Sequence, residues 1–98
     1  MQVQVIENRA DISGKVREVK PHETLEHYYT VKMDVETVTP VEGMANLMAS
    51  SKGMTVDVNV PEEQVESKKI VPGAKITLRV KKTGPAEVIA VPPPSEER

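Results

Sequence analysis

The chain lacks cysteine, phenylalanine and tryptophan, and it contains only two tyrosines. Without cysteine it can form no disulfide, use no thiol nucleophile and hold no metal through thiolates. Without large aromatic rings its core has to be filled by aliphatic side chains, of which valine is the most frequent. These absences favour a small aliphatic domain over a disulfide-stabilised or thiol-dependent one.

No charge of one sign dominates the chain, because 13 basic and 15 acidic residues leave a formal net charge of −2. This balance gives no overall attraction to nucleic acid or to an anionic membrane. There is no run of about 18 apolar residues and no basic-then-apolar leader, so we expect no membrane span and no signal peptide, which slightly favours the cytoplasm. The length of 98 residues suits one domain, expected at 1–92, with a disordered tail at 93–98.

Residues 52–82 carry the clearest strand pattern. Apolar and polar side chains alternate at Met54–Val60 and again at Ala74–Val80, which is the period of half-buried strands. Between them, Pro61 ends the first strand and begins a helix of about two turns, because it lacks an N–H and its ring presets φ. A Val-Pro-Gly turn at 71–73 then leads into the second strand.

Three further strands are expected around this unit. The strand at 11–20 alternates up to Val16, and Val19 then falls out of phase, which predicts a β-bulge between them. Gly14 within this strand is typical of a sharply coiled barrel strand, because a side chain would crowd the bend. The other two strands are expected at 28–39 and 86–91.

Five strands, a glycine inside the first, a helix between the third and fourth and a short last hairpin together resemble the OB-fold barrel, over roughly residues 10–92. The resemblance is architectural and depends on Gly14, the helical turn at 61–69 and the corner at 71–73. We therefore expect a mainly β fold, a small five- to six-stranded OB-like barrel with one short helix between strands three and four. The alternative is an immunoglobulin-like sandwich, which does not explain the helical turn.

The resemblance to the OB-fold implies oligonucleotide or oligosaccharide binding on strands two and three. Single-strand binding needs aromatic platforms for bases and cations for phosphates. The outward positions of these strands instead carry one tyrosine, one lysine and three carboxylates: Tyr28, Lys32, Asp34, Glu36 and Asp57. The basic residues fall on strands one and four, where they form either a phosphate-tracking surface or a solvated surface of mixed charge. We call this set the cationic stripe: Lys15, Arg17, Lys75, Arg79 and Lys81.

Metal binding and catalysis have little support in the sequence. His22 and His27 flank a loop that also carries two glutamates, but this spacing in a loop does not hold two imidazoles together, so solvated histidines are the default interpretation. The chain has no Gly-x-Ser-x-Gly, P-loop or dinucleotide motif. We expect no enzymatic activity, no cofactor and no metal.

An insert at 41–52 stands where many such barrels have a tight turn. Met44, Leu47 and Met48 have helical spacing within it, which predicts a helix of about two turns. Their side chains either plug an open end of the barrel or form an exposed patch for a partner, since methionine recurs at adaptable binding surfaces.

These observations predict a non-enzymatic binding or adaptor module, for which a protein partner is favoured over nucleic acid and no membrane is involved. The expected contacts are Met44, Leu47 and Met48, with Tyr28 and Lys32 at the barrel mouth. The alternative is a weak single-stranded nucleic-acid or anion binder that uses the cationic stripe. Residues 2–6, where Gln and Val alternate, could pair with a sheet edge or with another copy, which makes the chain a monomer or a weak homo-oligomer.

Overall fold

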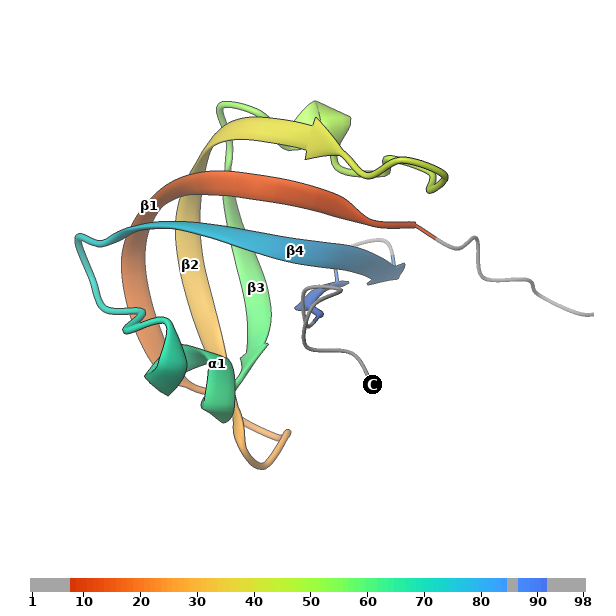
Figure 1. The fold of residues 1–98 in the computed structure, drawn as a ribbon. Helices are drawn as coiled ribbons and strands as arrows, with labels where there is room; N and C mark the ends of the chain where they lie inside the picture. The colour runs from red at the N-terminus through yellow and green to blue at the C-terminus, as the bar shows by residue number, and fades with distance from the viewer. Residues whose placement is uncertain (1–7, 85–86, 92–98) are drawn as a thin grey trace, which may run out of the picture.

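Five strands curve into a closed barrel within residues 8–84 and 87–91, the part of the chain that this computed structural model describes (Figure 1). The strands are β1 (Ala10–Pro21), β2 (Tyr28–Pro40), β3 (Thr55–Pro61), β4 (Lys75–Gly84) and β5 (Glu87–Ala90). A 3-10 helix, η1 (Ala49–Ser51), precedes β3, and α1 (Glu62–Ser67) follows it. The expected OB-like barrel with one short helix between the third and fourth strands is confirmed. The sandwich is excluded because the sheet closes on itself in the order β1-β2-β3-β5-β4.

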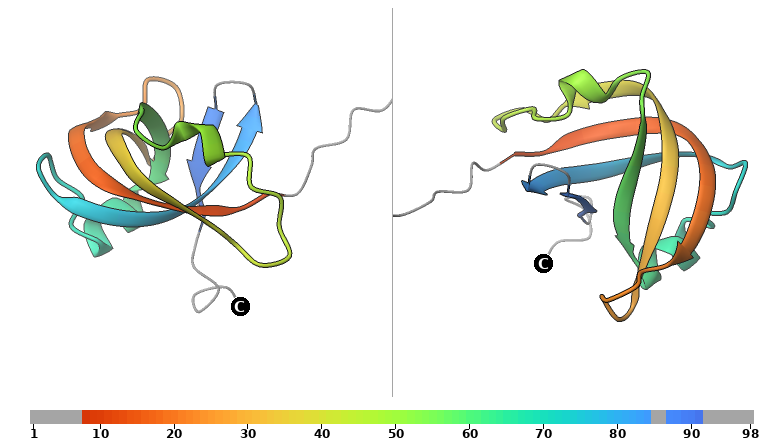
Figure 2. Two further views of the ribbon diagram at one scale, coloured as in Figure 1. Left: turned by 90° about the horizontal axis from the view of Figure 1, so that it is seen from above. Right: turned by 180° about the vertical axis from the view of Figure 1, so that it is seen from behind.

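The barrel closes through pairings of very unequal length. β1 pairs antiparallel with β2 along its length and with β4 over its first half, and β2 and β3 also pair along the whole of β3. By contrast, β3 and β5 run parallel, and within the described residues they pair only at Asn59 and Ile89. We call the line between β3 and β5 the seam. Figure 2 shows from above and from behind how strongly β1 and β2 curve to bring these two strands together.

The interior is aliphatic. The inward positions predicted for the middle of the strands are 0–2% exposed, and each such buried side chain contributes roughly 1.5–3 kcal/mol to folding. They include Val31, Met33, Val35, Val58, Val60, Leu78 and Val80. Met54 was expected on the same inward face, but it is 56% exposed because β3 begins one residue later, at Thr55.

The irregularities of β1 match the pattern of its sequence. The register between β1 and β2 shifts between Val16 and Glu18, which confirms the predicted bulge, and shifts again between Ser13 and Gly14. A Cβ added at Gly14 would collide with the carbonyl oxygen of Asp34 on β2. Only glycine allows the two strands to approach this closely at the bend.

The short helix α1 covers one end of the barrel (Figure 1). It was predicted within 61–69 and it spans Glu62–Ser67. Val65 packs on the core, Ile70 just after the helix is 2% exposed, and Gly73 takes the positive φ that the predicted turn requires. No helix in the described portion is long and apolar enough to cross a membrane.

The insert at 41–52 covers the opposite end, and the two-turn helix predicted there is wrong. Gly43 has φ of +82° and the Asn46 side chain accepts a hydrogen bond from the N–H of Met48 at 3.0 Å, so local turns replace helical bonds. Only η1, three residues long, is helical in the insert. The segments expected to pair at 2–6 and to form a tail at 93–98 lie outside the described residues.

Candidate functional site

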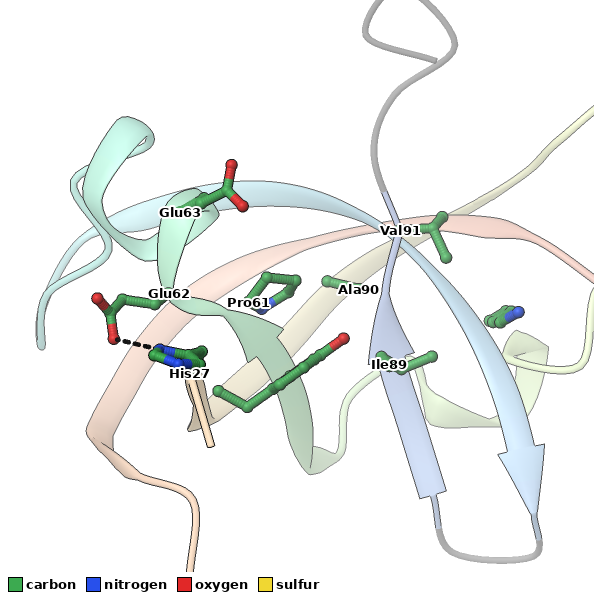
Figure 3. A pocket seen from close by; sticks show the side chains of 9 residues that line it. His27, Pro61, Glu62, Glu63, Ile89, Ala90 and Val91 are labelled. Atoms are coloured by element: carbon green, nitrogen blue, oxygen red, sulfur yellow. Dashed lines mark ion pairs between the residues drawn. The ribbon is translucent and has the colours of Figure 1, made fainter. Parts of the chain in front are cut away.

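A groove of about 530 Å³ opens on the outside of the barrel where β3 and β5 diverge beyond their single pair (Figure 3). We call it the α1-end groove. Its floor is apolar because register brings together side chains from three strands: Tyr28 begins β2 and pairs with Pro61 at the end of β3, while β5 supplies the facing wall. That floor consists of Tyr28, Pro61, Ile89, Ala90 and Val91.

Charged groups flank the floor from opposite sides. Glu62 and Glu63 begin α1 on one side, and Lys81, paired with Ile89 in the register of β4 and β5, lies on the other. Figure 3 shows Glu62 beside His27, whose Nδ1 is 4.0 Å from the Glu62 carboxylate. The N–H of Glu62 also donates to the carbonyl oxygen of His27 at 2.8 Å, which ties the β1–β2 loop to the start of α1.

The two histidines serve the loop in different ways. His22 Nδ1 accepts hydrogen bonds from the N–H groups of Thr24 at 3.1 Å and Leu25 at 3.0 Å, so this atom is committed to the turn. His27 lies at the other end of the loop, beside α1. Over 8–84 and 87–91, no three histidine, aspartate or glutamate side chains are grouped to hold a metal ion.

The basic residues of the cationic stripe lie on the neighbouring strands β1 and β4, and most of them pair with carboxylates, while Lys81 lines the α1-end groove. β1 and β4 are neighbours, with Lys15 opposite Lys75. Three of the five basic residues make ion pairs, which reduces the positive potential available to a phosphate. These pairs are Arg17 with Asp34 at 3.1 Å, Lys75 with Glu36 at 3.7 Å and Arg79 with Asp11 at 2.9 Å.

Asp34 is the centre of a small polar network on the outer face of β2. Its carboxylate accepts a hydrogen bond from the Thr55 hydroxyl at 2.5 Å and another from Arg17 at 3.1 Å. The Thr55 bond first, and then the Arg17 charge, hold the pKa of Asp34 below its ordinary value. Through these two bonds the Asp34 carboxylate links β2 to β1 and to β3.

The contacts predicted from the sequence do not form one surface. Met48 is 1% exposed and belongs to the core, so the expectation that it meets a partner is wrong, whereas Met44 and Leu47 are 40% and 39% exposed. Tyr28 lines the α1-end groove, and β2 runs thirteen residues, a contour of roughly 40 Å, from there to the insert. Lys32 lies between the two, 4.0 Å from Glu18.

No pattern in the sequence marks Ile89 and Pro61 as site residues. Ile89 was expected as an ordinary member of the last strand and Pro61 as the point where a strand ends and a helix begins. Their proximity depends on the parallel pairing of β3 with β5, which no local pattern encodes. The phase of β5 does carry one signal, since Val88 and Ala90 are buried and Ile89 between them faces outward.

Comparison with known proteins assigns no relatives: no family model matches the chain, and no curated protein matches it. The chemistry of the site is therefore judged from its geometry. An apolar floor can desolvate an aliphatic side chain or a proline, and flanking charges of opposite sign can orient the segment that carries it.

Proposed function

We propose that this chain is a non-enzymatic binding module that takes an extended segment of a protein partner into the α1-end groove. The observation that supports this most directly is the apolar floor of Tyr28, Pro61 and Ile89 between two acidic side chains and one basic one. A groove with this distribution favours a segment with a basic end, an aliphatic or proline-containing middle and an acidic end.

The outer face of the barrel has few of the groups that bind a single-stranded nucleic acid. Stacking platforms and unpaired cations are the groups that hold a single strand. The described part of the groove contributes one tyrosine, and its two glutamates would repel phosphates. The ion pairs of the cationic stripe lower its charge further, so binding of a protein segment remains the stronger proposal.

The test is an array of synthetic peptides that place a basic block, a Val-Pro-Val block and an acidic block in every order. We expect the basic–apolar–acidic order to bind best, and Ile89→Lys to weaken that binding at least about tenfold. Fluorescence anisotropy with the best peptide measures the change.

The matched control is Val71→Lys, which places the same charge on an exposed apolar residue outside the groove lining. Equal losses from both variants, or equal binding of all block orders, would contradict the proposal. An oligothymidine arm tests the alternative, because phosphate binding falls steeply with salt. Steep salt-dependent binding of this oligonucleotide, without peptide binding, would favour the cationic stripe instead.

A further inference from the structure

His27 lies where the loop between β1 and β2 meets α1, on the lining of the α1-end groove (Figure 3). Its side chain is 82% exposed, and Glu62, whose carboxylate lies 4.0 Å from Nδ1, is its ion-pair partner among the described residues. The hydrogen bond from the N–H of Glu62 to the carbonyl oxygen of His27 also joins the two residues at the backbone. Solvent protons therefore reach an imidazole that is kept beside one of the two carboxylates of the groove.

The other ionisable groups near His27 come from α1, β2, β4 and its own loop. They are Glu63, Tyr28, Lys81, Glu26, Glu23 and, at the far end of the loop, His22. Of these side-chain types only imidazole ordinarily changes charge between about pH 5 and 8. His22 does not line the groove, and its Nδ1 accepts the two hydrogen bonds of the loop turn. His27 is therefore the group of the groove lining that we expect to change charge over this range.

We propose that protonation of His27 weakens the binding of the partner segment to the α1-end groove. This regulation rests on the binding function proposed above. While the imidazole is neutral, the Glu62 carboxylate can accept the basic end of the segment. Once the imidazole is protonated, it pairs with Glu62 and its own charge repels that basic end. The empty groove then binds a proton more readily than the occupied groove does, so by linkage the affinity for the segment falls as pH falls.

Anisotropy titrations of the best basic–apolar–acidic peptide at about pH 7.5 and about pH 5.5 test the dependence. The peptide carries arginines as its basic block and is capped at both ends, so that its own groups keep their charge. At constant low salt we expect the affinity at the lower pH to be about two- to fivefold weaker, the range for exposed charge pairs. The control peptide has glutamines in place of the arginines and should lose no affinity.

Equal affinity of the arginine peptide at both pH values, or the same loss for the glutamine peptide, would overturn the regulation while leaving the binding function in place. No binding of any peptide at the higher pH would overturn both.

Matched histidine variants identify the group that takes up the proton. His27→Asn removes the imidazole, and asparagine readily adopts the φ of +65° found at this position. Its affinities at the two pH values should be equal. His22→Asn keeps a side-chain acceptor for the turn and should retain the pH dependence. Loss of the dependence in His22→Asn but not in His27→Asn would show that the loop turn responds to pH, and would overturn the role of His27.

Calorimetry gives a readout that a merely structural role of His27 would not move. Binding enthalpies measured near pH 6.5 in two buffers with different heats of ionisation count the protons exchanged per bound peptide. We expect protons to be released, up to one per peptide, by the parent chain and by His22→Asn, and none by His27→Asn. Proton uptake by the parent chain, or the same release from His27→Asn, would overturn the proposal. Circular dichroism at each pH checks that all three chains stay folded.

Discussion

In this barrel a single side chain makes hydrogen bonds of the kind that strand backbone usually makes. The amide of Asn8 both donates to and accepts from the backbone of Lys82, so it continues the pairing of β1 with β4 beyond Ala10, where the paired register ends. The same residue bridges to Ala45 in the insert. The Asn8 side chain therefore connects the start of β1 to the end of β4, and the backbone next to it connects the start of β1 to the insert that covers the barrel.

We expect Asn8→Asp to lower the free energy of unfolding by about 1–3 kcal/mol, because a carboxylate oxygen would replace the donor that faces the Lys82 carbonyl. Urea unfolding followed by circular dichroism measures the loss. The control is Asn59→Asp, the same change at a partly exposed position on β3. Similar losses at both positions would argue against a special role for the Asn8 amide.

The Asp34 network predicts how stability responds to acid. Its pKa is lowered in the folded chain, so the folded state holds its proton less tightly than the unfolded state does. The stabilisation is present above the unfolded pKa and is lost as pH falls through the folded pKa.

We expect Thr55→Val to move the Asp34 pKa up towards its ordinary value of 3.8 and to weaken the acid dependence of unfolding. Carboxyl chemical shifts followed through a pH titration measure the first effect. Thr30→Val, a similar change on the outer face of β2, should leave the Asp34 titration unchanged. A Thr55→Val titration curve identical to that of the parent chain would show that the hydroxyl does not hold this carboxylate.

Strands were predictable where one face is buried, because burial of that face places an apolar residue at every second position of the sequence. The bend at Gly14 and the bulge of β1 were also predictable, since both interrupt the regular alternation of apolar and polar side chains. The insert was misread because the spacing of its methionines resembles a helix, whereas Asn46 and Gly43 direct the backbone into turns. The α1-end groove could not be foreseen, because it joins strand ends that only the barrel closure brings together.

The insert predicts different roles for its two methionines. Met48 is 1% exposed, so Met48→Ala should lower the free energy of unfolding by about 2–5 kcal/mol through the cavity it leaves. Met44 is 40% exposed and Met44→Ala should change it by less than about 1 kcal/mol. Thermal or urea unfolding of the two variants compares them directly. Equal effects would mean that Met48 does not fill the end of the barrel.

The barrel consists of a curved sheet with long antiparallel pairings, and it is closed by one short strand. β1, β2, β3 and β4 form long antiparallel pairings, and the barrel is then completed by β5, four residues long. Two grooves lie along that closure, one on each side of the Asn59–Ile89 pair: the α1-end groove and a second groove lined in part by Met54, Val56 and Val88. An OB-like architecture hosts many unrelated functions, so the function has to be sought at these two grooves and not in the fold.

Because the pairing between β3 and β5 is short, some parts of the native barrel should open locally more readily than others. β5 can separate from β3 by breaking little backbone pairing, while the β1–β2 hairpin stays intact. Deuterium should therefore replace the amide hydrogens of β5 well before those in the middle of β2. Mass spectrometry of peptides from a timed labelling series would detect this order, and uniform protection of both strands would contradict it. A ligand wedged along the closure should slow exchange in β5 first.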